Sequence, residues 1–235
     1  MNTEDRKQQD RVAFILSEFK QLKHILDNKM DYYARKLDSR QERQRSLVGE
    51  CNGVRYFKPR KLTSKYGVDF FYSIIWHLET GDTLGQVYVE LDDGFLEIKN
   101  DGTESVLYTK HFMQRFLGRL NLQSYLEDFS IEKFIVAFVG IVSLDKPIVF
   151  EKNLGDFSIT HKDWYDACAC TSEGMFCIRY VNEKYCVYKT FISKNEFKPS
   201  QMRKWEKLMS ESAQDRYHEG MSTSYNQVFE ARKTL

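Results

Sequence analysis

The sequence predicts an α+β protein in which helices and an antiparallel sheet occupy separate stretches of the chain. Apolar residues recur at helical spacing through the first forty residues, and the period changes to two after Gly49. Two short turn sequences then contain the pairs Asp93-Gly94 and Asp101-Gly102, which are typical of tight hairpins. The 235 residues, of which 42% are hydrophobic and 14% aromatic, are enough to build a packed core. No internal repeat is evident in the sequence.

A long helix is predicted from about Asp5 to Leu47. Its apolar residues follow one face: Val12, Ile15, Leu16, Phe19, Leu22, Ile25, Leu26, Tyr33 and Leu37. Two interpretations stay open: the helix docks on its own domain, or it meets a partner protein or a second copy of the chain. We therefore expect an N-terminal helical appendage (1–48), a single α+β domain (49–220) and a frayed tail (221–235).

An antiparallel meander is predicted after the helix. Its expected strands are 54–58, 69–78, 85–91, 94–99 and 105–108. Pro59 should end the first strand or place it at an edge of the sheet. The strand 69–78 is apolar on both faces, as expected of a central strand.

Two central helices, a late hairpin and a C-terminal helix complete the predicted fold. Thr109 can cap a helix that runs to about Leu122, and Ser130 can cap a second helix, 131–144. Strands are expected at 147–151 and 157–161, followed by a hairpin from Met175 to Ser193. The last helix should begin near Pro199, because proline suits a first helical turn, and end near Gly220.

Charge and hydropathy bound the functions that the chain can have. Between Arg35 and Lys65 ten basic residues stand against three acidic ones, whereas between Glu79 and Glu104 eight acidic residues stand against Lys99 alone. The two segments can neutralise each other across the fold, or one can steer an anionic partner. The N-terminus is too polar for a secretion signal and the apolar stretch 134–144 is too short to cross a bilayer, so we expect a cytoplasmic protein without a membrane partner.

Five cysteines raise the question of a metal site. Four of them, Cys168, Cys170, Cys177 and Cys186, fall within nineteen residues, with His161 upstream. Zinc sites usually show paired C-x-x-C knuckles in loops, whereas Cys177 and Cys186 lie in strand-like apolar runs. We favour buried, reduced thiols and expect no metal and no cofactor.

The segment 108–120 carries the most specific pattern in the chain. On a helix, His111, Arg115 and Arg119 form one stripe, while Phe112 and Phe116 lie in the adjacent apolar stripe. Two arginines four residues apart repel each other, so their pairing favours nearby carboxylates or a bound anion. The phosphate-binding P-loop, G-x-G-x-x-G, H-E-x-x-H and G-x-S-x-G motifs do not occur in the sequence.

The H-x-x-x-R-x-x-x-R helix resembles that of small ribonuclease-toxin-like proteins, a group that includes barnase-like, colicin-like and RelE-like enzymes. The resemblance implies RNA cleavage without a metal, with His111 moving a proton at the ribose hydroxyl or the leaving oxygen. It also implies that Arg115 and Arg119 hold the phosphate. A residue from a late strand would complete such a site, and Lys189 and Thr190 are the candidates. Strand alternation would place Lys189 with Ser193 on one face and Tyr188 with Thr190 on the other.

Two further hypotheses compete with the ribonuclease. The stripe on the helix can be a structural network paired with carboxylates, in an interaction protein that captures a partner or a second copy through its N-terminal helix. The mixture of basic and aromatic residues from Arg55 to Tyr72 can instead contact single-stranded nucleic acid, although aromatics at strand spacing are more typical of a core.

Overall fold

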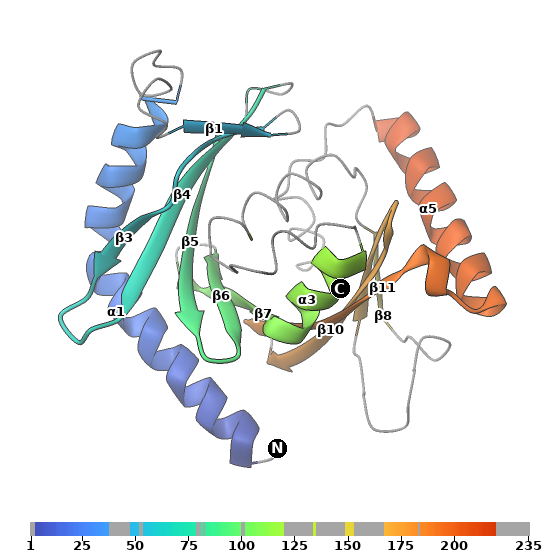
Figure 1. Ribbon diagram of the computed structural model, residues 1–235, viewed down its shortest axis with the longest axis horizontal. Helices are drawn as coiled ribbons and strands as arrows, with labels where there is room; N and C mark the ends of the chain where they lie inside the picture. Colours follow the sequence, from blue (N-terminus) through green and yellow to red (C-terminus); the bar gives the residue numbers. More distant parts are fainter. Residues whose placement is uncertain are drawn as a thin grey trace.

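The computed structural model of the chain describes residues 3–37, 48–51, 54–78, 81, 83–99, 102–119, 134, 149–152, 167–182 and 184–219. Its strands are β1 (Val48–Cys51), β2 (Val54–Phe57), β3 (Arg60–Thr63), β4 (Asp69–His77), β5 (Thr83–Leu91), β6 (Gly94–Lys99), β7 (Glu104–Thr109), β8 (Val149–Lys152), β9 (Ala167–Thr171), β10 (Gly174–Asn182) and β11 (Tyr185–Ser193). They form one sheet in the order β1-β2-β4-β5-β6-β7-β11-β10-β9-β8, with β3 also paired to β4 (Figure 1). The predicted α+β class is confirmed.

Helix α1 (Thr3–Ala34) packs along the sheet, as the docking interpretation expects (Figure 1). Its buried residues join one core cluster with residues of β4 to β7 and β11: Val12, Ile15, Phe19, Leu26, Phe70, Tyr72, Val87, Val89, Leu91, Leu96, Ile98, Leu107, Tyr185 and Val187. The helix ends at Ala34, whereas the sequence predicted it to continue to Leu47. The amides of Lys36 and Leu37 donate to the carbonyls of Tyr33 and Ala34, and this turn places Leu37 in a core with Phe57.

The predicted meander is present in β5, β6 and β7, which pair antiparallel in sequence order. Strands β1, β3 and β9 were not predicted. β1 and β3 are four residues long and β9 reads Ala-Cys-Ala-Cys-Thr, so none of them carries the clear alternation that marked the other strands.

A parallel pair joins the two parts of the sheet. β7 and β11 run side by side with Ser105 opposite Tyr185 and Tyr108 opposite Tyr188. Outward from the boundary between them the sheet continues as β7-β6-β5-β4 on one side, with β2 and β1 beyond β4, and as β11-β10-β9-β8 on the other. We call β4–β7 with α3 (Lys110–Arg119) the N-terminal unit. The C-terminal unit is β8–β11 with the 3-10 turn η3 (Lys194–Glu196) and helix α5 (Pro199–Glu219).

The two units share the geometry of one turn, although their sequences showed no repeat. Gly94 pairs with Thr109 in the first unit and Gly174 pairs with Ser193 in the second. The amide of Lys110 donates to the Asp93 carbonyl at 2.8 Å, and the amide of Lys194 donates to the Glu173 carbonyl at 3.0 Å. The matching contacts make the two units topological equivalents.

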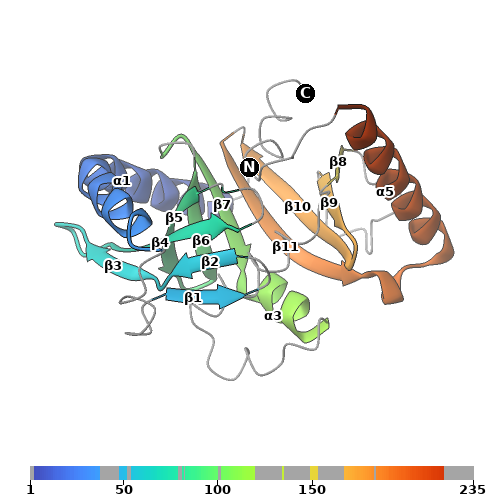
Figure 2. The ribbon, with the colours of Figure 1, turned by 90° about the horizontal axis from the view of Figure 1, so that it is seen from above.

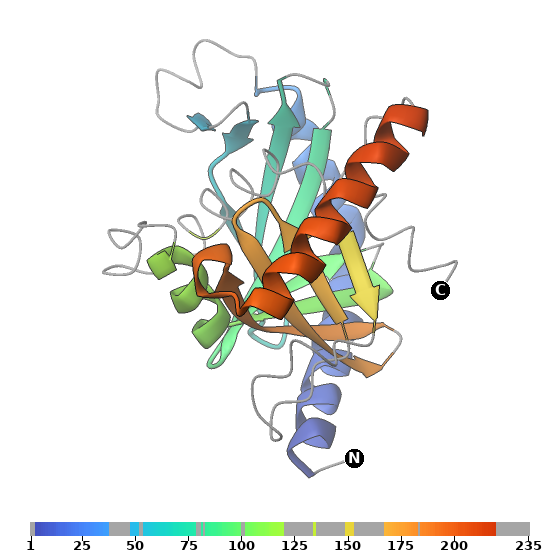
Figure 3. The same cartoon turned by 90° about the vertical axis from the view of Figure 1, so that its right-hand side faces the viewer.

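The helix that follows the last strand of each unit packs on the sheet, α3 mainly on β11 and α5 on β8 and β9. Figure 2 shows α1 and α5 at opposite ends of the molecule, with α3 on the opposite side of the sheet from α1. α3 packs on a cluster that includes Tyr108, Phe176, Tyr188 and Phe191. α5 begins at Pro199 as predicted and packs on β8 and β9, which it crosses in Figure 3.

Some predictions fall outside the described residues. These are the helix 131–144, apart from the helical and buried Phe134, the strand 157–161 and the tail 221–235. The strand expected at 147–151 is observed as β8. Among the described helices, none is both long and apolar enough to span a lipid bilayer.

Candidate functional site

Helix α3 presents the predicted stripe to solvent. Thr109 caps it, because the amide of Phe112 donates to the Thr109 hydroxyl at 3.1 Å. The same hydroxyl lies 3.1 Å from the Tyr188 carbonyl, so the cap also fixes the helix to β11. Phe112, Met113, Phe116 and Leu117 are buried, which leaves the opposite side of the helix open.

His111 and Arg115 lie on this open side and are both exposed. The Nε2 atom of His111 lies 3.4 Å from the Thr190 hydroxyl, so the structure brings together two of the predicted residues from distant parts of the chain. Within the described residues, neither His111 nor Arg115 forms an ion pair with a carboxylate. A bound anion could therefore reach both groups.

Arg119 is engaged within the protein. One of its guanidinium nitrogens lies 2.7 Å from a carboxylate oxygen of Glu196, and another donates to the Phe191 carbonyl. Its side chain is only 13% exposed. Burial lowers the pKa of Arg119, and the nearby charge of Arg115 lowers it further, whereas Glu196 acts in the opposite direction. This arrangement is the structural pairing that the sequence offered as an alternative to phosphate binding.

Strand β11 departs from the alternation assumed for Lys189 and Thr190. Tyr188 lies opposite Ile178 and Thr190 lies opposite Cys177, so Lys189 has no partner on β10 and forms a bulge. Because Cys177 and Ile178 are neighbours on β10, Tyr188 and Thr190 belong to opposite faces, not to one face as predicted. Lys189 is half-buried, and Thr190 is buried beside His111.

A pocket of about 400 Å³ lies at the other flank of α3. It is lined by Glu90, Leu91, Gly94, Phe95, Lys110, Met113 and Gln114. No sequence pattern singled out these residues, because they combine one helix with the preceding hairpin. The available signal was that Lys110 and Gln114 lie in the same helix as the motif, one step around from His111 and Arg115.

The four cysteines between 168 and 186 are buried and free. Cys168, Cys170 and Cys177 belong to the cluster under α5, whereas Cys186 belongs to the cluster under α3. Burial raises the pKa of Cys177, which keeps this thiol protonated. In the part of the chain that the structure describes, no group of three or more His, Cys, Asp or Glu residues could hold a metal ion.

The basic and aromatic segment from Arg55 to Tyr72 is mostly structural. Phe57, Phe70 and Tyr72 are buried, so their rings cannot stack on a base. Arg55 pairs with Glu50 at 3.0 Å, and Lys61 pairs with Asp69 at 3.1 Å.

Comparison of the chain with family models, with curated proteins and with solved structures finds no match.

Proposed function

We propose that this protein is a non-enzymatic interaction protein that pairs with a second copy of itself along the exposed face of α1. The observation that supports the proposal is a line of large apolar side chains on that face. Phe14 is 46% exposed, Ile25 43% and Tyr32 50%. Their spacings of 11 and 7 residues are close to whole helical turns, so the three side chains lie in a row about 27 Å long.

The row continues onto the sheet. Tyr66, in the turn between β3 and β4, is 63% exposed, and its ring lies 6.4 Å from that of Phe14. Large apolar side chains that are exposed on one face, two of them with their rings paired, are typical of an interaction surface. The opposite face of α1 packs into the core through Val12, Ile15, Phe19 and Leu26, which fixes the helix on the sheet.

Charge complementarity favours an antiparallel pair of α1 helices over a parallel one. In a two-fold antiparallel pair centred between residues 22 and 23, Asp10 faces Arg35 of the second copy, and Phe14 lies within one residue of the level of Tyr32. Asp10 and Arg35 are exposed and have no ion-pair partner among the described residues. A parallel pair would instead bring Asp10 against Asp10 and Arg35 against Arg35, which repel each other.

Analytical ultracentrifugation over a range of concentrations tests the pairing. The wild type should dimerise, and Ile25→Lys should be monomeric with an unchanged circular dichroism spectrum, because it places two charges at the centre of the apolar row. Lys20→Glu, at an exposed position on the far side of α1, is the control and should still dimerise. A wild type that stays monomeric at about 100 μM would refute the proposal.

A charge exchange tests the orientation. Asp10→Arg and Arg35→Asp should each weaken the dimer, because each leaves like charges facing across the interface. The double variant should recover most of the affinity if the helices are antiparallel. Failure of the double variant to recover would mean that the copies meet in another arrangement.

We propose RNA cleavage without a metal as a second candidate function, reduced to His111, Arg115 and Thr190. It is supported by the exposure of His111 and Arg115 and by the Thr190 hydroxyl next to the imidazole. Mixed RNA incubated in EDTA should be cleaved by the wild type and not by His111→Ala or Arg115→Ala, while Arg203→Ala on α5 should behave as the wild type. Equal cleavage by all proteins, or cleavage by none, rules this candidate out.

A further inference from the structure

The pocket beside α3 has the composition of a small-molecule site. Its polar residues, Glu90, Lys110 and Gln114, are exposed at the mouth, and its apolar residues, Leu91, Phe95 and Met113, are buried in the walls. Its volume of about 400 Å³ is within the usual range for ligand pockets.

The walls of the pocket are fixed before any ligand arrives. The turn between β5 and β6 is held by the hydrogen bond from the Lys110 amide to the Asp93 carbonyl, at 2.8 Å. Gly94 lies so close to β7 that an added Cβ would overlap the Tyr108 carbonyl oxygen. A preformed site loses little entropy when it binds a ligand.

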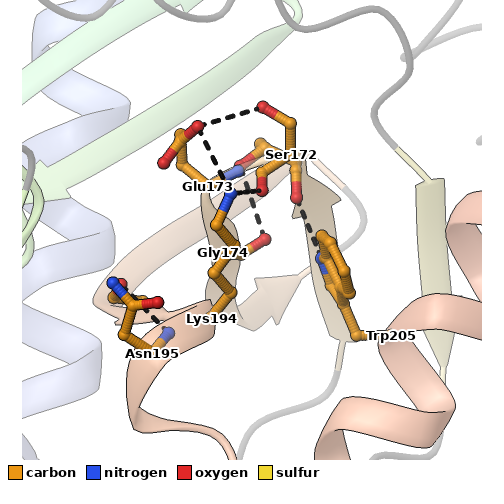
Figure 4. Close-up of polar contacts among 8 residues, drawn as sticks. Ser172, Glu173, Gly174, Lys194, Asn195 and Trp205 are labelled. Carbon is orange, nitrogen blue, oxygen red and sulfur yellow. Dashed lines mark hydrogen bonds and ion pairs between the residues drawn. The ribbon is translucent and has the colours of Figure 1, made fainter.

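The C-terminal unit shows what fills the equivalent space there. Thr171 pairs with Gly174 as Leu91 pairs with Gly94, so Cys170 and Met175 are the counterparts of Glu90 and Phe95. The ring of Trp205, from α5, packs on the cluster that contains Cys170 and Met175. Its indole N–H donates to the Thr171 carbonyl at 2.9 Å (Figure 4).

The charged groups of the two units also differ. Lys194 in the C-terminal unit, the counterpart of Lys110, donates to the Ser172 carbonyl at 3.1 Å and lies 3.7 Å from the Glu173 carboxylate (Figure 4). Among the described residues, the side chains of Glu90 and Lys110 have no such partner. The N-terminal unit thus has an open place for a ring, bordered by a carboxylate and an ammonium group that lack a partner among the described residues.

We infer that this pocket binds a free aromatic amino acid. The aromatic ring takes the place that Trp205 occupies in the C-terminal unit and packs on Phe95 and Met113. The α-ammonium group pairs with Glu90 and the α-carboxylate pairs with Lys110, while the amide of Gln114 closes the mouth. A zwitterion satisfies both free charges at once, which a simple acid or amine does not.

Isothermal titration calorimetry with L-tryptophan, indole-3-propionate and tryptamine tests the assignment. L-tryptophan should bind most tightly, because each analogue lacks one of the two charged groups. Glu90→Gln should lower the affinity for L-tryptophan about tenfold and leave the affinity for indole-3-propionate unchanged. Lys110→Gln should lower the affinities for L-tryptophan and indole-3-propionate about tenfold and leave the affinity for tryptamine unchanged.

Matched variants separate the pocket from the rest of the surface. Gln114→Trp should abolish binding of all three compounds, because the new side chain occupies the mouth of the pocket. Glu206→Gln on α5 and Lys20→Gln on α1 change exposed charges far from the pocket and should bind as the wild type. Absence of binding at millimolar concentration, equal binding of the analogues, or binding that survives Gln114→Trp would each overturn the inference.

Discussion

Three residues on one helical stripe have different environments in this protein. His111 and Arg115 are exposed, whereas Arg119 is held by Glu196 and by the Phe191 carbonyl. The C-terminal end of α3 lies near the end of β11 and η3, so among the described residues only the last member of the stripe pairs with a carboxylate. A pattern of side chains on a helix therefore does not establish a common role, because each member meets a different part of the fold.

Tyr72 gives a prediction for alkaline pH. Burial raises the pKa of Tyr72 to about 12, and the neighbouring Tyr33 adds to the shift. The folded state therefore holds this proton more tightly than the unfolded state, whose tyrosines ionise near pH 10. The protonated Tyr72 hydroxyl therefore makes its full contribution to the free energy of unfolding below pH 10, and this contribution is lost as the pH rises to about 12.

Urea denaturation at several pH values measures this contribution. Between pH 10 and 12 the wild type should lose more stability than Tyr72→Phe, which has no proton to release. Tyr66→Phe, at an exposed position, is the control and should follow the wild type. Parallel curves for the wild type and Tyr72→Phe would contradict the prediction.

Thr109 gives a prediction for the start of α3. Its hydroxyl accepts from the Phe112 amide and lies within hydrogen-bond distance of the Tyr188 carbonyl. Thr109→Ala should lower the free energy of unfolding by about 1–2 kcal/mol, as loss of an N-cap typically does. Thr109→Ser keeps the hydroxyl and should recover most of this loss in urea denaturation, and an equal loss in both variants would argue against the cap.

At the scale of elements, two hairpin turns are held by the same backbone contact. Gly94 and Gly174 each lie against the strand that they pair with, and a Cβ would overlap the carbonyl oxygen of Tyr108 or Ile192. The close approach lets the amides of Lys110 and Lys194 reach the carbonyls of the two turns. A glycine at the start of the second strand is thus a requirement of the turn in both units.

Alanine substitutions test this requirement. Gly94→Ala and Gly174→Ala should each destabilise the protein by about 2 kcal/mol or more, because the backbone must move to admit the methyl group. Gly118→Ala is the matched control, since no described residue comes within 4 Å of a Cβ there and alanine favours the helix by about 0.5–1 kcal/mol. Thermal unfolding measures all three, and neutral effects at Gly94 and Gly174 would contradict the close approach.

At the scale of the whole molecule, α1 is part of the core. Val12, Ile15, Phe19 and Leu26 are each at most 5% exposed and cover one face of the sheet. Burying four such side chains contributes about 6–12 kcal/mol, from about 1.5–3 kcal/mol each, which is comparable with the whole stability of a typical domain.

A chain that begins at Val48 should therefore fail to fold. We expect it to be insoluble, or to lack the cooperative unfolding transition of the full chain in circular dichroism. A cooperative transition in the shortened chain would mean that α1 is dispensable. Deletion of α1 is for this reason no test of self-association, and the surface variant Ile25→Lys is the appropriate one.

Local patterns predicted much of the fold. The hairpin from Met175 to Ser193, the meander of β5 to β7, the cap at Thr109 and the start of α5 at Pro199 all depend on residues close together in the sequence. The candidate site was predicted less well. The stripe of α3 is exposed at His111 and Arg115 as its spacing indicated, but the pairing of Arg119 with Glu196 depends on a distant turn.

The sequence by itself determined most of the described helices and strands, apart from β1, β3, β9 and the end of α1, because periodicity and turn residues act over a few neighbours. Tertiary structure alone decided that β7 and β11 pair in parallel, and so that two similar units share one sheet. It also decided that Trp205 packs against the hairpin of the C-terminal unit, while the equivalent place beside Lys110 in the N-terminal unit is a pocket. Such contacts join residues far apart in the chain, and no local spacing encodes which distant surface a side chain will meet.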